Sequence, residues 1–381
     1  MRGSLKTVAT LSVLAMAVAT GCTGNSGPTG HSSPVSTPAS TGSGWSTTRA
    51  AGNFTACMVT DVGGLDDKSF NQSSWEGFLV AHQRNPSITI KNLTSASPAA
   101  YAKNVSTFLA QKCNIIITVG YLMAAVTQRA AREHPHQEFA IVDCSYASGC
   151  LTKPVLHNID QLTYNTVQDS FLGGYLAAAM TKTGTVATYG GEQFGTVTIY
   201  MDGFWDGVQY YNKQHHKNIK VLGWNEKTQK GTFAGSFSNI SAGSQIANSF
   251  INKGADIIFP VAGGVGLGTA EAVQAADASG KHVRMMWVDT DGCVAAPAYC
   301  QYFITSVEKG ITTSVTGAIM SAFHDSFRGG AYVGTLANGG AVLAAFHQVT
   351  VPRSVLAELN RLKSQIESGK IRPRTRSPVD P

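Results

Sequence analysis

The chain has 381 residues, of which 43% are hydrophobic and 40 are glycine, and these values are typical of a globular α/β protein with many tight turns. Its formal net charge of +6 is spread along the chain, without the basic patch interleaved with aromatics that nucleic-acid binding requires. The composition therefore argues against a nucleic-acid-binding protein, and the length suffices for one large or two medium domains.

The first 22 residues have the three parts of an export signal. Arg2 and Lys6 form a basic start, residues 7–20 form an apolar run, and small residues lead to Cys22. The apolar run is too short to span a bilayer, which takes about 20 apolar residues. Ala19-Thr20-Gly21-Cys22 resembles a bacterial lipobox, although leucine is more usual at the first position. We expect a lipid on Cys22; the alternative is a plain secretory signal.

Two further segments have compositions that do not favour a packed core. Residues 23–52 consist largely of Thr, Ser, Gly, Pro and Ala, and we expect them to form a flexible tether. Residues 369–381 contain four prolines or glycines beside three arginines, and we expect a flexible tail there.

Six cysteines remain besides Cys22, which suits an oxidising compartment. Fifteen pairings are possible, and the sequence alone does not choose among them. Short spacing favours Cys144–Cys150 and Cys293–Cys300, which would leave Cys57–Cys113 to join the starts of two neighbouring strands. The alternative is that these cysteines are buried free thiols.

Strand-like and helix-like segments alternate along the rest of the chain. We expect strands at residues 54–60, 88–93, 115–119, 139–142, 156–159, 185–189, 220–224, 257–261, 284–288 and 302–306. We expect helices at residues 70–84, 99–111, 123–133, 166–181, 197–215, 241–253, 269–279 and 312–327. This alternation predicts two Rossmann-like lobes with parallel sheets, and a ligand site in the cleft at the carboxyl ends of the strands.

Residues that suit a flat, polar ligand follow the first strand. The strand runs into Asp61 and then, past two glycines, into Phe70 and Asn71 at the start of a helix. An aromatic ring can stack on a base, and an amide can pair with its edge through one acceptor and two donors. Core packing is the alternative for Phe70, and helix capping is the alternative for the intervening Asp66, Asp67 and Ser69.

Other strand ends carry further candidate groups. Asp143 could accept hydrogen bonds from a ring, or equally cap a turn. Asp289, followed closely by Asp291, offers acceptors of the kind that vicinal hydroxyls of a sugar require, and Lys309 follows the last strand. The glycines of residues 263–268 do not keep the dinucleotide-binding spacing, and they better suit a backbone turn against a small polar ligand.

Catalytic motifs are missing from the sequence. It has no G-x-S-x-G elbow, no P-loop and no H-E-x-x-H motif. We therefore expect a protein that is not an enzyme and that carries no cofactor and no metal.

The stretch DVGGLDDKSFNQSSWEG at residues 61–77 resembles the opening signature of the basic membrane protein lipoproteins, which are purine-nucleoside-receptor-like substrate-binding proteins of ABC transporters. The resemblance continues in the family's order through FAIVD, DSFLGGYLAA, GADIIFPVAGGVGLG, WVDTDG and ITSVEKG. It implies a type I periplasmic-binding fold, with two lobes joined by three crossovers. We expect one lobe from residues 53–163 and 285–312, and the other from residues 164–284 and 313–368.

The resemblance also implies roles for individual residues. Phe70 would stack on the base, with Asn71 and Asp143 pairing with its edge. Asp289 and Lys309 would hold the ribose, helped by the turn at Gly263-Gly264. A second stacking aromatic, usually phenylalanine in the family, would be Tyr200 here.

Three functions are compatible with the sequence. The first is a lipid-anchored, extracytoplasmic, monomeric binding protein that delivers a purine nucleoside to an ABC permease. The second is a protein of the same fold that binds another small polar ligand, such as a sugar. The third is a surface enzyme that processes nucleosides.

Overall fold

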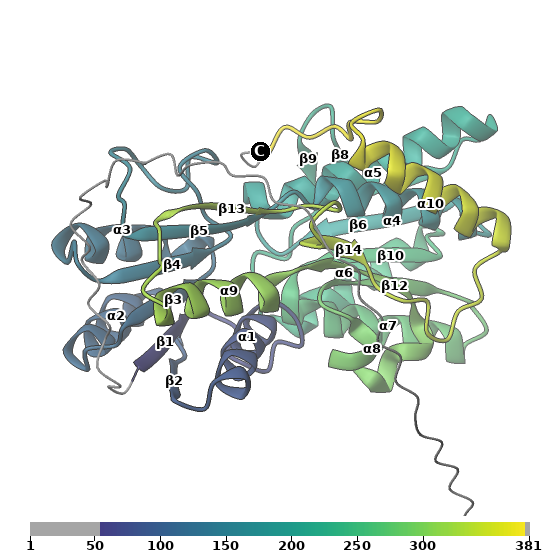
Figure 1. Ribbon diagram of the computed structural model, residues 1–381. Helices are drawn as coiled ribbons and strands as arrows, with labels where there is room; N and C mark the ends of the chain where they lie inside the picture. Colours follow the sequence, from purple (N-terminus) through teal and green to yellow (C-terminus); the bar gives the residue numbers. More distant parts are fainter. Residues whose placement is uncertain (1–53, 378–381) are drawn as a thin grey trace, which may run out of the picture. The chain divides into compact units, whose positions relative to one another are not determined.

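Two six-stranded sheets form the centres of two α/β lobes in the computed structural model, which describes residues 54–377 (Figure 1). The expected signal peptide at 1–22 with Cys22 and the expected tether at 23–52 lie outside the described residues. None of the helices between residues 54 and 377 combines the length and the apolarity that a membrane span requires.

The first lobe is built on an all-parallel sheet in the order β13-β5-β4-β3-β1-β2. Its strands are β1 (Phe54–Thr60), β2 (Ile88–Leu93), β3 (Ile115–Val119), β4 (Glu138–Val142), β5 (Ile159–Tyr164) and β13 (Gly330–Gly334). All five residues of the central strand β3 are buried, as expected for a strand covered on both faces. Helices α1 (Phe70–Arg84) and α9 (Ile311–Phe323) pack on one face, and α2 (Tyr101–Ala110) and α3 (Ala124–Glu133) on the other.

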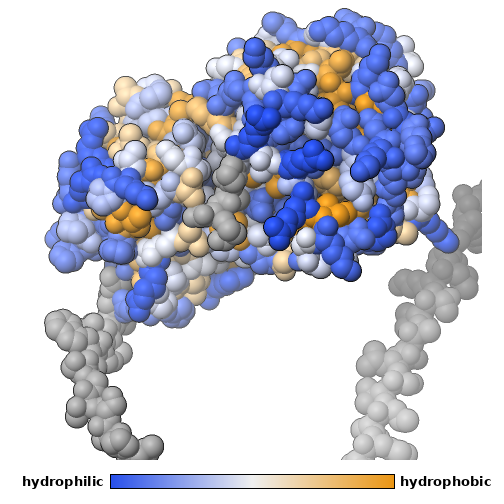
Figure 2. All heavy atoms as spheres, turned by 90° about the horizontal axis from the view of Figure 1, so that it is seen from above, coloured by the Kyte–Doolittle hydropathy of each residue, from blue (hydrophilic) through white to orange (hydrophobic). Residues whose placement is uncertain are grey.

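The second lobe repeats this plan with the order β14-β12-β11-β10-β6-β7, in which only β14 is antiparallel to its neighbour. Its strands are β6 (Thr185–Gly190), β7 (Lys220–Leu222), β10 (Ile257–Val261), β11 (Arg284–Asp289), β12 (Phe303–Lys309) and β14 (Ala341–Leu343), beside a small β8 (Trp224–Asn225) and β9 (Lys230–Gly231) pair. One face of this sheet is covered by helices α4 (Val167–Met180), α5 (Gly195–His215) and α10 (Arg353–Glu367). The other face is covered by helices α6 (Ile240–Asn252) and α7 (Gly266–Ala278) and the short α8 (Gly292–Ala295). In Figure 2, hydrophilic residues cover most of the visible face.

The sheet order corrects the expected division of the chain after residue 284. Strands β11 and β12 extend the second sheet, although we expected residues 285–312 in the first lobe. Helix α9 then packs on α1 in the first lobe, where the Thr316 hydroxyl donates to the Gly77 carbonyl at 3.0 Å, and β13 joins β5. The sequence indicates that residues around 284–288 and 302–306 form strands, but it does not show which sheet each strand extends.

The chain crosses between the lobes three times within the described residues: after β5, after β12 and after β13. The crossing after β13 is short, and its two ends approach each other where Gly334 faces Gly340. A Cβ atom on Gly340 would lie 2.3 Å from the Gly334 Cα, so this close backbone approach requires glycine.

The described part of the C-terminal segment differs from the expected flexible tail at 369–381. Residues 374–377 lie along α5: the Arg374 amide donates to Asp206 at 3.0 Å, and the Ser377 and Thr198 hydroxyls are 2.7 Å apart. The carboxylate of Asp202, which is fully buried, accepts bonds from the Thr375 hydroxyl at 2.9 Å and the Arg376 amide at 3.0 Å. Its other oxygen accepts from the Trp224 indole at 2.9 Å and the Gln229 amide at 2.8 Å. This buried acceptor holds the segment in place, and Gly and Pro content alone did not reveal it.

Deletion of residues 374–381 should therefore destabilise the protein, because it removes two of these four donors to Asp202. We expect a loss of about 1–3 kcal/mol in the free energy of unfolding, measured from the urea midpoint. Deletion of residues 378–381 alone is the matched control and should leave the midpoint unchanged. Equal midpoints for the two deletions would contradict this account of the segment.

Candidate functional site

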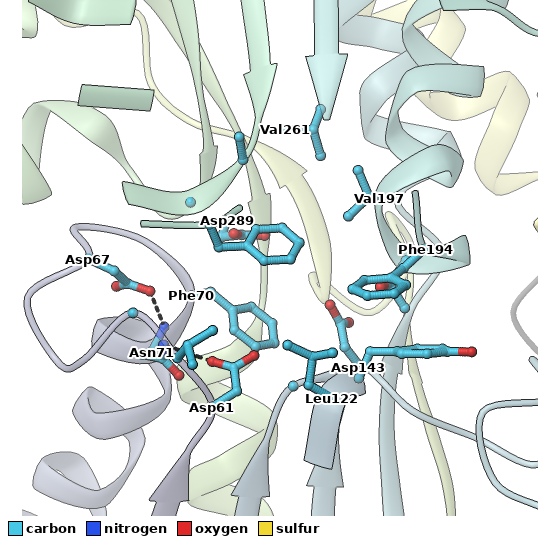
Figure 3. A pocket seen from close by; sticks show the side chains of 18 of the residues that line it. Asp61, Asp67, Phe70, Asn71, Leu122, Asp143, Phe194, Val197, Val261 and Asp289 are labelled. Atoms are coloured by element: carbon cyan, nitrogen blue, oxygen red, sulfur yellow. Dashed lines mark hydrogen bonds between the residues drawn. The ribbon is translucent and has the colours of Figure 1, made fainter. Parts of the chain in front are cut away.

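A cavity lies between the lobes, where strands of both sheets end (Figure 3). It encloses about 610 Å³ of space not filled by atoms, including open solvent at its mouth. The residues that line it follow β1, β3, β4, β6 and β10, end β10, β11 and β12, lie on α1 and α5, or precede α6. The cavity therefore occupies the position expected for ligands of parallel α/β sheets.

The structure brings seven of the eight sequence-predicted binding residues to this cavity: Asp61, Phe70, Asn71, Asp143, Tyr200, Asp289 and Lys309. Gly264 is not among the lining residues, whereas its neighbour Gly263 is. Gly264 lies instead against backbone, and a Cβ atom there would be 3.5 Å from the Phe237 carbonyl oxygen and 3.6 Å from that of Asp67.

A buried lysine lies at the centre of the site. The Lys309 ammonium contacts Asp143 of the first lobe and lies 3.6 Å from Asp289 Oδ1 of the second. Burial by itself lowers the pKa of Lys309, but the carboxylates of Asp143 and Asp289 more than offset this and hold that pKa above its ordinary value. The ammonium also lies 5.2 Å from the centre of the Phe70 ring. This ion pair joins the two lobes inside the cavity.

The two aspartates share an uncommon backbone conformation. Asp143 follows β4 with φ of 64°, and Asp289 ends β11 with φ of 68°. Positive φ is uncommon for residues other than glycine, although aspartate tolerates it better than most. In both lobes, a left-handed turn at a strand end presents a carboxylate to the same ammonium.

Asp61 and Asn71 form a polar pair on the first lobe. The Asn71 Nδ2 donates to Asp61 Oδ1 at 3.2 Å (Figure 3), while Asn71 Oδ1 is buried and has no hydrogen-bond partner within the described residues. Burial, with smaller contributions from Asp67, Asp143 and Glu192, raises the pKa of Asp61 to about 8 against the lowering effect of Asn71. A carboxyl with this pKa is largely protonated at neutral pH, so it can donate as well as accept.

The loop between β1 and α1 has a capping role as well as a binding role. Asp67 accepts from the backbone amides of Ser69, Asn71 and Gln72, at 3.0, 2.8 and 3.1 Å. Its side chain therefore caps the amides at the start of α1, one of the alternatives that the sequence left open, although Ser69 occupies the N-cap position. Ser69 instead reaches the second lobe, where its hydroxyl lies 2.9 Å from Asp289 Oδ2 and 3.0 Å from the Val288 carbonyl oxygen.

The aromatic side chains of the cavity differ from the sequence expectation in one respect. Tyr200 lines the cavity but is only 1% exposed, and its hydroxyl donates to Asp289 Oδ1 at 3.1 Å. Phe194 directly precedes α5, is partly exposed and points into the cavity from the second lobe (Figure 3). It stacks on Tyr121 of the first lobe with ring centres 4.7 Å apart. Phe194 was not anticipated from the sequence, although its place between a strand end and a helix start was a usable signal.

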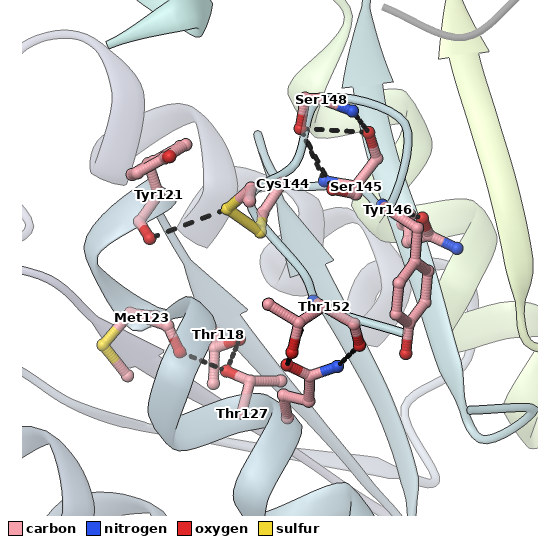
Figure 4. The surroundings of a disulfide bond; sticks show 12 residues. Thr118, Tyr121, Met123, Thr127, Cys144, Ser145, Tyr146, Ser148 and Thr152 are labelled. Atoms are coloured by element: carbon pink, nitrogen blue, oxygen red, sulfur yellow. Dashed lines mark hydrogen bonds between the residues drawn. A yellow bond between two sulfur atoms is a disulfide. The ribbon is translucent and has the colours of Figure 1, made fainter. Parts of the chain in front are cut away.

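A disulfide closes the loop that follows Asp143 (Figure 4). Cys144 bonds to Cys150, and the loop between them is held by hydrogen bonds of Ser145 with Ser148. The bonds Cys57–Cys113 and Cys293–Cys300 are also present. All three pairings agree with the ones that spacing favoured over free thiols.

Replacement of Asp61 by asparagine should change how stability depends on pH. Because the folded pKa is raised from 3.8 to about 8, the folded state holds a proton that the unfolded state releases between these values. Stability therefore falls as pH rises through this window, by about 1.4 kcal/mol per pH unit for one such group. Urea unfolding at several pH values between 4 and 8 should give a shallower decline for Asp61→Asn than for the wild type.

Asp66→Asn provides the control for this measurement, since Asp66 is an exposed carboxylate of the same loop. Its decline should match that of the wild type. Parallel declines for Asp61→Asn and the wild type would show that Asp61 does not hold this proton.

The family described as Bmp, ABC transporter substrate-binding protein PnrA-like, matches residues 54–345 of the chain. The CD4+ T-cell-stimulating antigen of Listeria monocytogenes is 30% identical over 337 residues, which cover 85% of this chain and 89% of that protein. The ABC transporter nucleoside-binding protein BmpA of Lactococcus lactis is 27% identical over 332 residues, which cover 83% of this chain and 88% of that protein.

A solved solute-binding protein of an ABC transporter system from Aeropyrum pernix K1 has a TM-score of 0.74 at 21% identity, covering 84% of this chain and 92% of that one. This likeness confirms the expected fold, a type I periplasmic-binding fold with two Rossmann-like lobes. The family match covers both lobes and most of the described chain. The chain therefore belongs to the Bmp family of PnrA-like ABC transporter substrate-binding proteins.

Proposed function

We propose that the protein binds a purine nucleoside in the interlobe cavity and delivers it to the permease of an ABC importer. The observation that carries this proposal is that two kinds of groups line one cavity. We take Phe70 and Phe194, with the acceptors of Asn71 and Asp61, as one part of the site, and Asp289 and Lys309 as the other. The Lactococcus lactis relative, an ABC transporter nucleoside-binding protein, supports the same ligand class.

The first part suits a flat heterocycle. Phe70 comes from the first lobe and Phe194 from the second, and both point into the cavity (Figure 3). Stacking on an aromatic side chain contributes about 1–3 kcal/mol per base in nucleic-acid binders. A purine edge also carries N–H groups that can satisfy the unpaired Asn71 Oδ1, and a buried acceptor left unpaired costs about 1–3 kcal/mol.

The second part suits a sugar. Asp289 offers an acceptor to a sugar hydroxyl, while Lys309 offers N–H donors to its oxygens. Because the ion pair with Asp143 fixes the ammonium, little conformational freedom is lost there when the ligand binds. A nucleoside has a donor-rich base and a hydroxylated sugar in one molecule, and so matches both parts.

The N-terminal sequence supports a location outside the cell membrane for this activity. A lipid on Cys22, followed by the Thr-, Ser-, Gly-, Pro- and Ala-rich segment 23–52, would hold the binding protein outside the cell membrane and close to its permease. We include the lipid anchor in the proposal on this sequence argument. Mass spectrometry of the mature N-terminus tests it, since an unmodified N-terminal residue other than Cys22 would contradict it.

Titration calorimetry with guanosine and inosine tests the proposed ligand. The wild type should bind at least one of them, and Phe70→Ala should weaken binding by about tenfold or more, because it removes a stacking surface worth about 1–3 kcal/mol. The matched control is Phe327→Ala, which removes another partly buried phenylalanine of the first-lobe region that does not line the cavity. Its affinity should equal that of the wild type.

Two outcomes would overturn the proposal in different ways. Thermal stabilisation by a monosaccharide such as arabinose, with none by nucleosides, would assign the cavity to sugars. Conversion of the added nucleoside during incubation, detected by chromatography, would instead identify an enzyme.

A further inference from the structure

We propose that Tyr121 and Phe194 form a latch that keeps the cavity closed over its ligand and sets the rate of ligand release. This inference rests on the proposed nucleoside function and goes beyond it, because it concerns how long a bound ligand stays. Three features carry it: the contact between the two rings, the packing behind them, and the different way in which the other side of the cavity is closed.

The two rings join the lobes by direct contact. Tyr121 follows β3 of the first lobe, and Phe194 directly precedes α5 of the second. Their centres lie 4.7 Å apart and their planes are inclined by 14°, an arrangement in which aromatic rings attract each other beyond the area that they bury. Both side chains line the cavity and both are partly exposed. The stacked pair therefore lies between the interior of the cavity and solvent.

The surroundings of Tyr121 agree with a place at the mouth of the cavity. Tyr121 and Leu122 line the cavity and also line a second depression, whose other residues include the exposed Arg129 and Arg132 of α3. Tyr121 thus borders both the ligand space and the outer surface. A ligand that leaves on this side has to part the Tyr121 ring from its partner.

The half of the latch on the second lobe is held by packing. The Phe194 ring also stacks on Phe237, with centres 6.2 Å apart and planes inclined by 24°. Phe237 in turn lies directly on Gly191, where a Cβ atom would be only 2.4 Å from the Phe237 ring. A closely packed ring has little freedom to turn away, so Phe194 is kept in position to meet Tyr121.

The other side of the cavity is closed by hydrogen bonds. Figure 3 shows Asp67, in the loop before α1, and Phe194 on opposite sides of the cavity. In that loop the Lys68 carbonyl accepts from the Trp287 indole at 2.9 Å, and the Ser69 hydroxyl lies 3.0 Å from a backbone carbonyl oxygen of β11. Trp287 and Ser69 are fully buried. Parting the lobes there breaks hydrogen bonds, whereas parting the two rings breaks only a ring contact, so release should begin at the latch.

Stopped-flow release of guanosine or inosine, whichever binds more tightly, tests this inference on the wild type, Tyr121→Leu, Phe194→Leu and the double variant. Leucine keeps an apolar side chain but removes the stack. Each single substitution should raise the dissociation rate constant by about twofold to tenfold, as expected for loss of one aromatic pair. The double variant should release the ligand no faster than the faster single variant, because either substitution already removes the latch.

Trp75→Leu is the matched control, because it removes a first-lobe ring that stacks on Phe78 with centres 5.5 Å apart and does not line the cavity. Its dissociation rate constant should equal that of the wild type. Multiplied effects in the double variant would mean that the two rings act independently, and wild-type release from both single variants would mean that neither ring holds the cavity closed. Either result would overturn the inference. Failure of the wild type to bind both nucleosides would instead overturn the proposed function on which the inference rests, so the two failures are distinguishable.

Discussion

The ammonium of Lys309 is the group on which the architecture of the site depends. Among the described residues that line the cavity, it alone is positively charged, while Asp61, Asp67, Asp143 and Asp289 are potential negative charges. Removing a charge from water is costly unless a partner of opposite charge is close. Lys309 and its two aspartates come from three different strands of two lobes, so the site requires both lobes to be folded and in contact.

The remaining acids of the cavity are accommodated in other ways. Asp67 is surrounded by the backbone amides at the start of α1, where the helix dipole favours negative charge. Asp61 has no cation beside it within the described residues, and its raised pKa leaves it largely neutral at pH 7. The cavity thus holds four acids without a large unpaired charge. Asp143 and Asp289 pair with Lys309, Asp67 caps a helix, and Asp61 is protonated.

Much of the fold could be predicted from the sequence, because short apolar runs alternate regularly with helical segments. The bounds of β1, α1, β2 and β3 agree with the expected ones. The strand expected at 156–159 instead lies at Ile159–Tyr164, and β13, β14 and α10 were not anticipated. The lobe assignment after residue 284 also failed, since strand pairing is a long-range property that local periodicity does not contain.

The candidate site was predicted mainly by its strand-end residues, which the topology necessarily brings to one edge of each sheet. Phe194 was missed, although the loop between β6 and α5 that carries it also follows a strand end. The role of Tyr200 was only partly anticipated: the resemblance supplied a stacking aromatic, whereas the structure turns its hydroxyl toward Asp289. Hydrogen-bond direction depends on side-chain orientation, which the sequence does not give.

The bond between Cys144 and Cys150 fixes the start of a loop whose middle lies at the surface. Cys144 directly follows Asp143, so the covalent ring fixes the chain at the point where the carboxylate enters the cavity. Ala147, within the ring, is exposed. Substitution there can alter the outer surface of the protein while Asp143 keeps its place, so this surface loop is free to diversify without loss of the charge balance inside the cavity.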